Sequence, residues 1–212
     1  PDGSLVAMVH CNNCTSDLNA WVNLFKEYQQ LLGVPVDMNE VFGKLYNHAL
    51  EGDADCGGLI SYNYISGEPV TGLAEGRPMF VRSANDKFNL ANFMRSHLYA
   101  SVGVLKIGND ILFNEEHVKV DRITGHGGLF KTKGVGQRIL AAAINSPISV
   151  METAVEGGAW GIALRGFYSV NIGALESLAD ILENKVFAGH KGVGIAPTAE
   201  DVAGFHLYIE NY

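Results

Sequence analysis

The sequence predicts an α/β fold in which helices flank a mixed sheet. Short β-rich runs alternate with longer amphipathic helical patterns, which is typical of a layered α/β domain rather than a sandwich or a helix bundle. The 212 residues are 47% hydrophobic and 18% charged, as in a packed domain. No internal repeat or linker divides the chain, so residues 1–212 are expected to form one domain.

The elements expected in the first half follow from apolar spacing, caps and turn residues. A buried strand is expected over residues 4–10. Thr15, Ser16 and Asp17 offer N-caps for a helix that ends at Gly33. The capping-box spacing of Asp37 and Glu40 opens a second helix. The expected elements are the strand 4–10, helices 15–33 and 37–50, a strand 58–64, a turn-rich surface loop 66–82, and a helix 89–107 stopped by Gly108-Asn109-Asp110.

The second half continues the alternation of strands and helices. A glycine turn at residues 125–128 follows a strand directly. Thr198 and Asp201 again have the spacing of a capping box. Lys185, His190 and Lys191 indicate a solvated basic loop beside Gly192–Gly194. The expected elements are strands 118–124 and 148–151 and helices 134–145, 156–170, 177–186 and 198–208.

Composition and charge exclude several classes of protein. The net charge of −8 argues against bulk binding of nucleic acid, which depends on clustered Lys and Arg. No apolar run reaches the roughly 18 residues of a membrane-spanning helix. Three cysteines do not make a disulfide framework, so a reducing, cytoplasmic setting is expected. The chain opens at Pro1 on a turn and a strand pattern, and we interpret it as a fragment whose N-terminal part is missing.

The segment from Gly125 to Gln137 carries the strongest chemical signal. It is expected to run from a strand through a glycine turn into a helix. Glycines let backbone N–H groups approach an anion, and a helix N-terminus adds partial positive charge. Lys131 and Lys133 would add attraction for phosphate. The segment is neither a Walker A loop nor a Rossmann fingerprint, so a tight strand-to-helix turn with two solvated lysines is the alternative interpretation.

Three motifs in order extend this signal. Gly127-Gly128 is followed by Thr132 and, nine positions after Gly128, by Gln137. The run 137–150 matches the pattern Q-x-x-A-D-x-x-G-x-P-V, and residues 156–163 stand where A-x-x-x-G-A-A is found. Upstream lie Cys56-Gly-Gly-Leu-Ile60 and Gly67-Glu68-Pro69. Together these motifs resemble the C-terminal domain of FGGY-family carbohydrate kinases, which has an actin-like (ribonuclease H-like) ATPase fold.

The resemblance, which favours pentulose kinases such as xylulose kinase, implies half of an ATP site. Its residues would be Gly127, Gly128, Lys131, Thr132 and Gln137, with Gly157 and Gly158 letting their helix approach the adenosine side. Mg²⁺ would neutralise the phosphates. A missing N-terminal domain would supply the sugar contacts and the catalytic Asp, so this chain alone is predicted to be inactive. The expected partners are a small sugar, ATP and that domain, with no nucleic acid and no membrane, and a homodimer is left open.

The alternative is a non-catalytic actin-like scaffold or protein-interaction domain. The departures from the family pattern at His126 and at Asn145-Ser146 favour it. The two hypotheses differ in what occupies the glycine turn. A kinase domain should expose an open polar cleft there, whereas a scaffold is expected to fill that cleft with Phe130 or His126.

Several other residues that could carry chemistry also have a structural interpretation. The run His10-Cys11-x-x-Cys14 invites a metal or redox interpretation, but Cys56 is the only further cysteine, and a structural zinc site usually takes two such pairs. Structural cysteines are therefore expected, with a three-cysteine-plus-His site as the alternative. Trp21 and Phe25 are expected in the core. The remaining acid–base candidates, expected to be mostly solvated, are Asp53, Asp55, Asp110, Glu115, Glu116 and Asp121.

Overall fold

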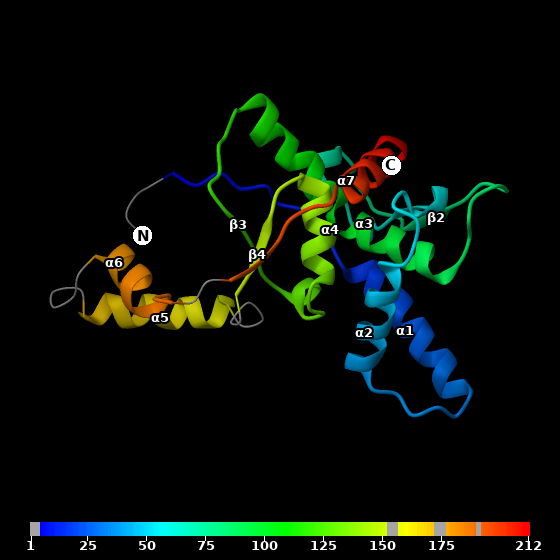
Figure 1. Ribbon diagram of the computed structural model, residues 1–212, viewed down its shortest axis with the longest axis horizontal. Coiled ribbons are helices and arrows are strands. Elements are labelled where there is room, and N and C mark those ends of the chain that lie inside the picture. The colour runs from blue at the N-terminus through cyan, green and yellow to red at the C-terminus, as the bar shows by residue number, and fades with distance from the viewer. Residues whose placement is uncertain (1–4, 152–156, 172–176, 190–191) are drawn as a thin grey trace.

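A computed structural model describes residues 5–151, 157–171, 177–189 and 192–212 (Figure 1). Its centre is the long helix α3 (Leu90–Asp110), against which the other elements of the main body pack. Helices α1 (Ser16–Leu31) and α2 (Met38–Ala49) project from one side as a pair, and α5 (Gly157–Asn171) and α6 (Leu178–Ile181) lie apart on the opposite side. The expected α/β class is confirmed.

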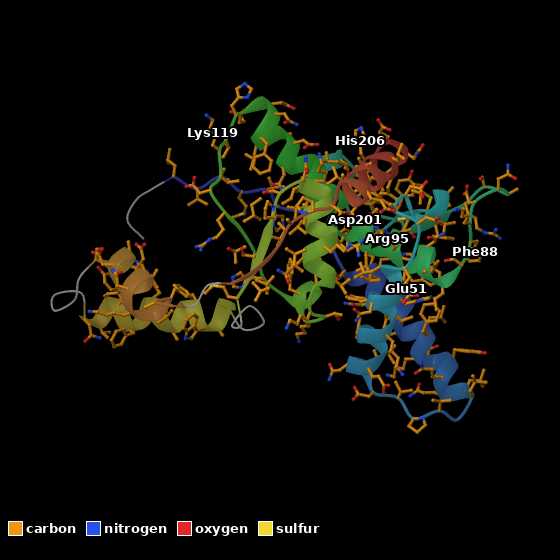
Figure 2. The ribbon with its side chains drawn as sticks, viewed as in Figure 1. Glu51, Phe88, Arg95, Lys119, Asp201 and His206 are labelled. Atoms are coloured by element: carbon orange, nitrogen blue, oxygen red, sulfur yellow. The ribbon has the colours of Figure 1, made fainter. Side chains whose placement is uncertain are left out.

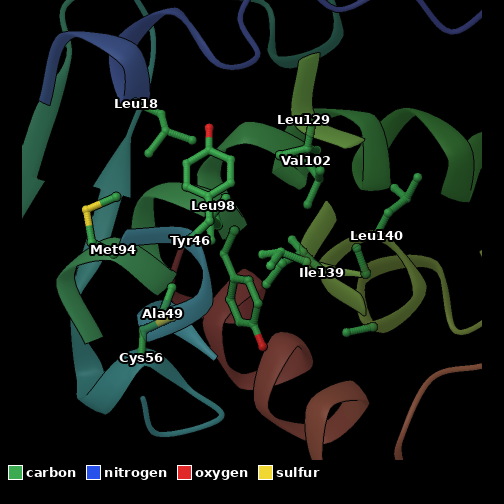
Figure 3. Close-up of a cluster of buried hydrophobic side chains, with 14 of the residues drawn as sticks. Leu18, Tyr46, Ala49, Cys56, Met94, Leu98, Val102, Leu129, Ile139 and Leu140 are labelled. Carbon is green, nitrogen blue, oxygen red and sulfur yellow. The ribbon is translucent and has the colours of Figure 1, made fainter. Parts of the chain in front are cut away.

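The core forms around α3 because nearly every face of this helix is covered. Asn89 caps its N-terminus, where the side-chain oxygen accepts a hydrogen bond from the Asn92 N–H. Helix α2, helix α4 (Val135–Ile144) and the first strand all contact it. Figure 3 shows Met94, Leu98 and Val102 of α3 among side chains from these neighbours. Burial of this apolar surface is the main stabilising contribution to the fold.

Two small sheets flank this core. Strands β1 (Ile60–Tyr62) and β2 (Met79–Val81) pair antiparallel, with Tyr62 opposite Met79. The second sheet has the order β3 (Ile123–Gly125), β4 (Ile148–Val150), β5 (Val193–Ile195). Strands β3 and β4 are parallel and β4 and β5 antiparallel, so Val150 lies opposite Val193. Helix α4 makes the connection from β3 to β4.

A buried ion network joins three helices. Arg95 of α3 and Asp201 of α7 (Ala199–Asn211) are each 2% exposed, and Arg95 Nη2 lies 2.5 Å from Asp201 Oδ1 (Figure 2). Arg138 of α4 donates through Nε to Asp201 Oδ2 at 2.6 Å, and Thr198 Oγ1 donates to the same oxygen at 2.8 Å. Burial opposes ionisation of Asp201, but the hydrogen bonds from Arg138, Thr198 and Arg95 outweigh it and lower its pKa to about 2. The network therefore fixes α7 against α3 and α4.

The strand expected over residues 4–10 is wrong for residues 5–10, and Ser4 lies outside the described residues. Leu5, Val6 and Met8 are exposed, and among the described residues no strand pairs with this segment. A strand is stable only where its backbone groups find a partner. Val9 instead packs against Gly108 in α3, where any side chain would overlap it. Gly108 therefore serves this contact and does not stop the helix.

The other differences concern short elements and the ends of elements. Of the strand expected over residues 118–124, only the end forms one, as β3, and residues 118–122 are not in a strand. Helix α3 continues through Asp110 into a π-turn at Ile111–Glu115, and α6 likewise continues into a π-turn at Leu182–Val186. Strand β2 lies inside the expected loop 66–82, and β5 inside the glycine-rich segment expected as a loop. Both are three residues long and largely exposed, so their sequence signal is weak. Glu156, His190 and Lys191 lie outside the described residues. Within the described part of the chain, no helix is long and apolar enough to cross a membrane.

Candidate functional site

The glycine segment forms an open turn between β3 and α4. Gly127 has φ +99° and Gly134 φ +83°, so both adopt backbone conformations that favour glycine. Residues Gly128–Phe130 form a 3-10 turn closed by a hydrogen bond from the Phe130 N–H to the Gly127 carbonyl at 3.1 Å. Helix α4 begins at Val135. The expected order of strand, glycine turn and helix is thus present.

The residues expected to contact phosphate occupy this turn. A Cβ added at Gly127 or Gly128 would meet no atom within 4 Å, so the space beside both glycines is open. Lys131 follows directly and is exposed, and Thr132 is half-buried. These four residues therefore lie together at an accessible backbone turn. Such a surface lets an anion approach N–H groups closely.

Gln137 lies away from this open surface. It is buried on α4, and its side-chain nitrogen donates to the carbonyls of Ile148 at 3.0 Å and Val193 at 2.7 Å. The side chain therefore ties α4 to β4 and β5. This bonding gives Gln137 a structural role, and its contact with a nucleotide stays a prediction.

A pocket of about 390 Å³ adjoins the turn. Its walls come from α5, from α6 with the π-turn after it, and from His126 in the glycine segment. Trp160 and Phe187 meet edge to face across it, with ring centroids 5.4 Å apart. Leu164 and Leu182 make the lining mainly apolar, and Arg165 adds one cation. A concave apolar pocket with a few polar groups is typical of a small-molecule site.

Gly157 allows the close approach of α5 to the turn. A Cβ at Gly157 would lie 2.6 Å from Nδ1 of His126, too near for any side chain without movement of the imidazole. Gly158 is different, because a Cβ there would point into open space. Phe130 packs its ring against Gly125 and His126 forms one wall of the pocket, so neither ring removes the open space.

The residues present fit a nucleotide better than a dedicated metal site. The open turn offers backbone N–H groups and Lys131 to phosphate, and the apolar pocket suits a flat base. Among the described residues, no group of three or more His, Cys, Asp or Glu side chains could hold a metal ion.

The cysteine candidates do not gather into a site in the described structure. Burial, together with the negative charge of Glu68 and with Cys14, raises the pKa of Cys11 to about 11. Burial also raises the pKa of Cys14, and that of Cys56 well above its usual value. Thiols held in the protonated form are poor nucleophiles and poor metal ligands. Cys56 is buried, as expected of a structural cysteine, whereas Cys14 is exposed.

The acidic candidates engage in local contacts. Asp53 accepts from Lys87 Nζ at 2.8 Å and from Asn92 Nδ2 at 2.9 Å, and hydrogen bonds from these two residues lower its pKa. Asp55 caps the turn at Gly57, and Asp110 pairs with Lys106. Glu115, Glu116 and Asp121 are exposed, as expected.

The sequence did not predict two buried polar clusters, one at Arg95 and Asp201 and one at His97. Arg95 carries no sequence signal of a special role, and the spacing of Asp201 indicates only a helix cap. His97 was treated as one position on the apolar side of its helix, yet its Nδ1 lies 2.8 Å from Ser61 Oγ and 3.6 Å from Asp17 Oδ2. Both oxygens face the same ring nitrogen, and the group is buried. This arrangement therefore lacks the two-sided geometry of a catalytic triad.

The fold is that of the ribonuclease H-like domains found in FGGY sugar kinases. The chain belongs to the FGGY family of carbohydrate kinases, whose C-terminal domain model matches residues 1–170. This confirms the resemblance read from the three motifs. A search of curated proteins gave no match.

Solved structures show the same fold at low sequence identity. A xylulose kinase from Rhodospirillum rubrum is 18% identical with a TM-score of 0.66, over 95% of this chain and 37% of that protein. A gluconate kinase from Lactobacillus acidophilus is 20% identical (TM-score 0.59, 79% of this chain and 33% of that one). A glycerol kinase from Plasmodium falciparum, solved with ADP, is 15% identical (TM-score 0.59, 90% and 37%). The chain thus spans about a third of each protein.

Proposed function

We propose that this chain is the nucleotide-facing domain of an ATP-dependent carbohydrate kinase. The observation that carries the proposal is the junction of the open glycine turn with the apolar pocket beside α5. One feature suits the phosphates and the other suits the base of a single nucleotide. Membership of the FGGY family supports the same assignment.

Each residue of the site has a separable role in this proposal. The N–H groups at Gly127 and Gly128 bind phosphate oxygens, and Lys131 adds a positive charge at the exposed edge of the turn. The Thr132 hydroxyl donates a further hydrogen bond. Gly157 keeps α5 close to His126, and Gly158 leaves the surface beside it clear. Bound ATP with Mg²⁺ supplies the phosphoryl group that a sugar hydroxyl accepts.

The remaining parts of the reaction are assigned to the rest of the protein. In this proposal an N-terminal domain binds the sugar and provides an Asp as general base, and the two domains enclose the nucleotide. The substrate is a ketose, a pentulose such as xylulose, which the name of the Rhodospirillum rubrum structure supports. Phosphoryl transfer of this kind depends chiefly on positioning and charge stabilisation.

Nucleotide titration of the chain tests this site. Isothermal titration with ATP and Mg²⁺ should show one site per chain. Lys131→Ala should weaken binding about tenfold, because one charge-assisted contact is lost. Gly157→Ala should also weaken it, because the new methyl group would displace the His126 imidazole, which lines the pocket.

The matched control is Lys44→Ala, which removes an exposed lysine of α2 that pairs with Glu40. It should bind ATP like the unchanged chain. Absence of ATP binding by the folded chain, or equal loss in Lys44→Ala and Lys131→Ala, would contradict the assignment and favour the scaffold hypothesis.

A further inference from the structure

A second concave surface lies on the other side of the molecule from α5 and α6, beside β2 (Figure 1). We call it the tyrosine groove. Its lining includes Ile209 and three tyrosines that we call its wall, Tyr62, Tyr64 and Tyr212. Two exposed charged residues, Glu75 and Arg77, also line it, and we call them its rim. Its volume is about 460 Å³, within the range of small-molecule sites.

The three tyrosine rings form one fixed aromatic wall. The ring centroids of Tyr62 and Tyr212 are 4.9 Å apart, those of Tyr64 and Tyr212 are 6.0 Å apart, and those of Tyr62 and Tyr64 are 6.5 Å apart. The Tyr62 hydroxyl donates to the carbonyl of Asn211 at 3.3 Å. The ring orientations are thus set by contacts within the protein, before any ligand binds.

The loop that carries the rim is also held in place. Glu68, at its start, is fully buried, and its Oε2 accepts hydrogen bonds from the backbone N–H groups of Asn12 at 2.9 Å and Asn13 at 3.1 Å. The loop then closes on itself, because the backbones of Glu68 and Leu73 exchange two hydrogen bonds of 2.8 and 3.1 Å. Glu75 and Arg77 follow directly and stand at the edge of the tyrosine groove. The tyrosine rings and the backbone of the loop are thus held in place before a ligand binds, which lowers the entropic cost of binding.

We propose that the tyrosine groove binds a neutral saccharide, at a site separate from the nucleotide turn. A sugar ring has one face rich in C–H groups, which suits the apolar face of a tyrosine ring. Its hydroxyls both donate and accept, so they can satisfy the Glu75 carboxylate and the Arg77 guanidinium together.

The binding is tested by saturation-transfer NMR on the full 212-residue chain without nucleotide. The probe is methyl α-D-glucopyranoside, a neutral glycoside. Its ring protons should receive saturation from the protein. Tyr62→Ala should abolish the transfer, and Glu75→Gln and Arg77→Ala should each reduce the affinity at least fivefold. Because both rim residues are exposed, these two variants should keep the circular dichroism spectrum of the unchanged chain.

Glu200→Gln, an exposed carboxylate of α7 outside the tyrosine groove, is the matched control and should bind normally. No transfer to the glycoside, or transfer unaffected by Tyr62→Ala and Arg77→Ala, would overturn the proposal. So would Tyr62-dependent transfer to benzoate or L-phenylalanine in place of the glycoside. Since ATP is absent throughout, this result is independent of the proposed kinase function.

Discussion

His97 is a buried histidine whose surroundings disfavour its charged form. Trp21, Phe80 and Phe93 pack around its ring, and its Nε2 is buried without a hydrogen-bond partner among the described residues. Burial lowers the pKa of His97 below 6.5, although Asp17 opposes the shift. The folded state therefore takes up a proton less readily than the unfolded state.

This shift predicts a loss of stability in acid. As pH falls below about 6.5, the unfolded chain binds the proton first, so the free energy of unfolding decreases by up to about 1.4 kcal/mol per pH unit from this group. Urea unfolding between pH 7.5 and 5 measures the slope. His97→Gln should flatten it, whereas His206→Gln, on the exposed face of α7 (Figure 2), should leave it unchanged. Equal slopes in all three chains would refute this role of His97.

Cys11 should react slowly with alkylating reagents. With its pKa raised to about 11 by burial, Glu68 and Cys14, roughly one thiol in a thousand is ionised at pH 8. Iodoacetamide should therefore modify Cys11 about a hundredfold more slowly than an unperturbed thiol such as that of glutathione, as followed by mass spectrometry of peptides. In urea the two rates should converge. A fast reaction of Cys11 in the folded chain would contradict its raised pKa.

Sequence reasoning at single positions succeeded where the signal is local. Asp37 and Thr198 cap their helices through their own side chains, as their spacing predicts. The side chain of Thr15, where helix α1 begins, makes no such hydrogen bond. The contact between Gly157 and His126 depends on how α5 packs against the turn, which no spacing along the chain encodes. The same holds for the Gln137 amide, which bonds to two strands. The glycine turn was therefore predictable, and the pocket beside it was not.

Helices were predicted more reliably than strands because their signals differ in length. Helices α1, α2, α4 and α7 each carry several turns of apolar spacing and end near the expected residues. Strands β2 and β5 have three residues each and exist through pairing with distant partners. Such pairing depends on the tertiary structure, so the local sequence of these strands does not predict it.

Two glycines in helices should respond to alanine in opposite directions. At Gly43 in α2, a Cβ would meet nothing within 4 Å, so Gly43→Ala should raise the free energy of unfolding by about 0.5–1 kcal/mol. At Gly204 in α7, a Cβ would overlap the carbonyl oxygen of Ala54, so Gly204→Ala should lower it by about 1–3 kcal/mol. Urea unfolding of the two variants measures both changes in the free energy of unfolding. Equal changes would show that α7 does not pack against the backbone at Ala54.

The chain as a whole carries one half of the proposed reaction. We therefore expect it to release no ADP from ATP in response to sugar, because the proposed general base lies outside it. The full-length protein, assayed with ATP, Mg²⁺ and a panel of pentuloses, pentoses, glycerol and gluconate, should show sugar-dependent release. Failure of the folded full-length protein on every sugar would count against the kinase, and release by the 212-residue chain would show that it contains a base not recognised here.

Because Val150 pairs with Val193, the chain can be shortened or lengthened between these two residues without separating β4 from β5. The described residues between them include α5, α6 and most of the lining of the apolar pocket, and the chain returns to the sheet beside the strand that it left. Directly paired residues in antiparallel strands have Cα atoms about 5 Å apart, a gap that a two-residue hairpin turn closes. We therefore expect that the segment between Val150 and Val193 can be deleted or replaced as a unit, while the hydrophobic core around α3 stays intact.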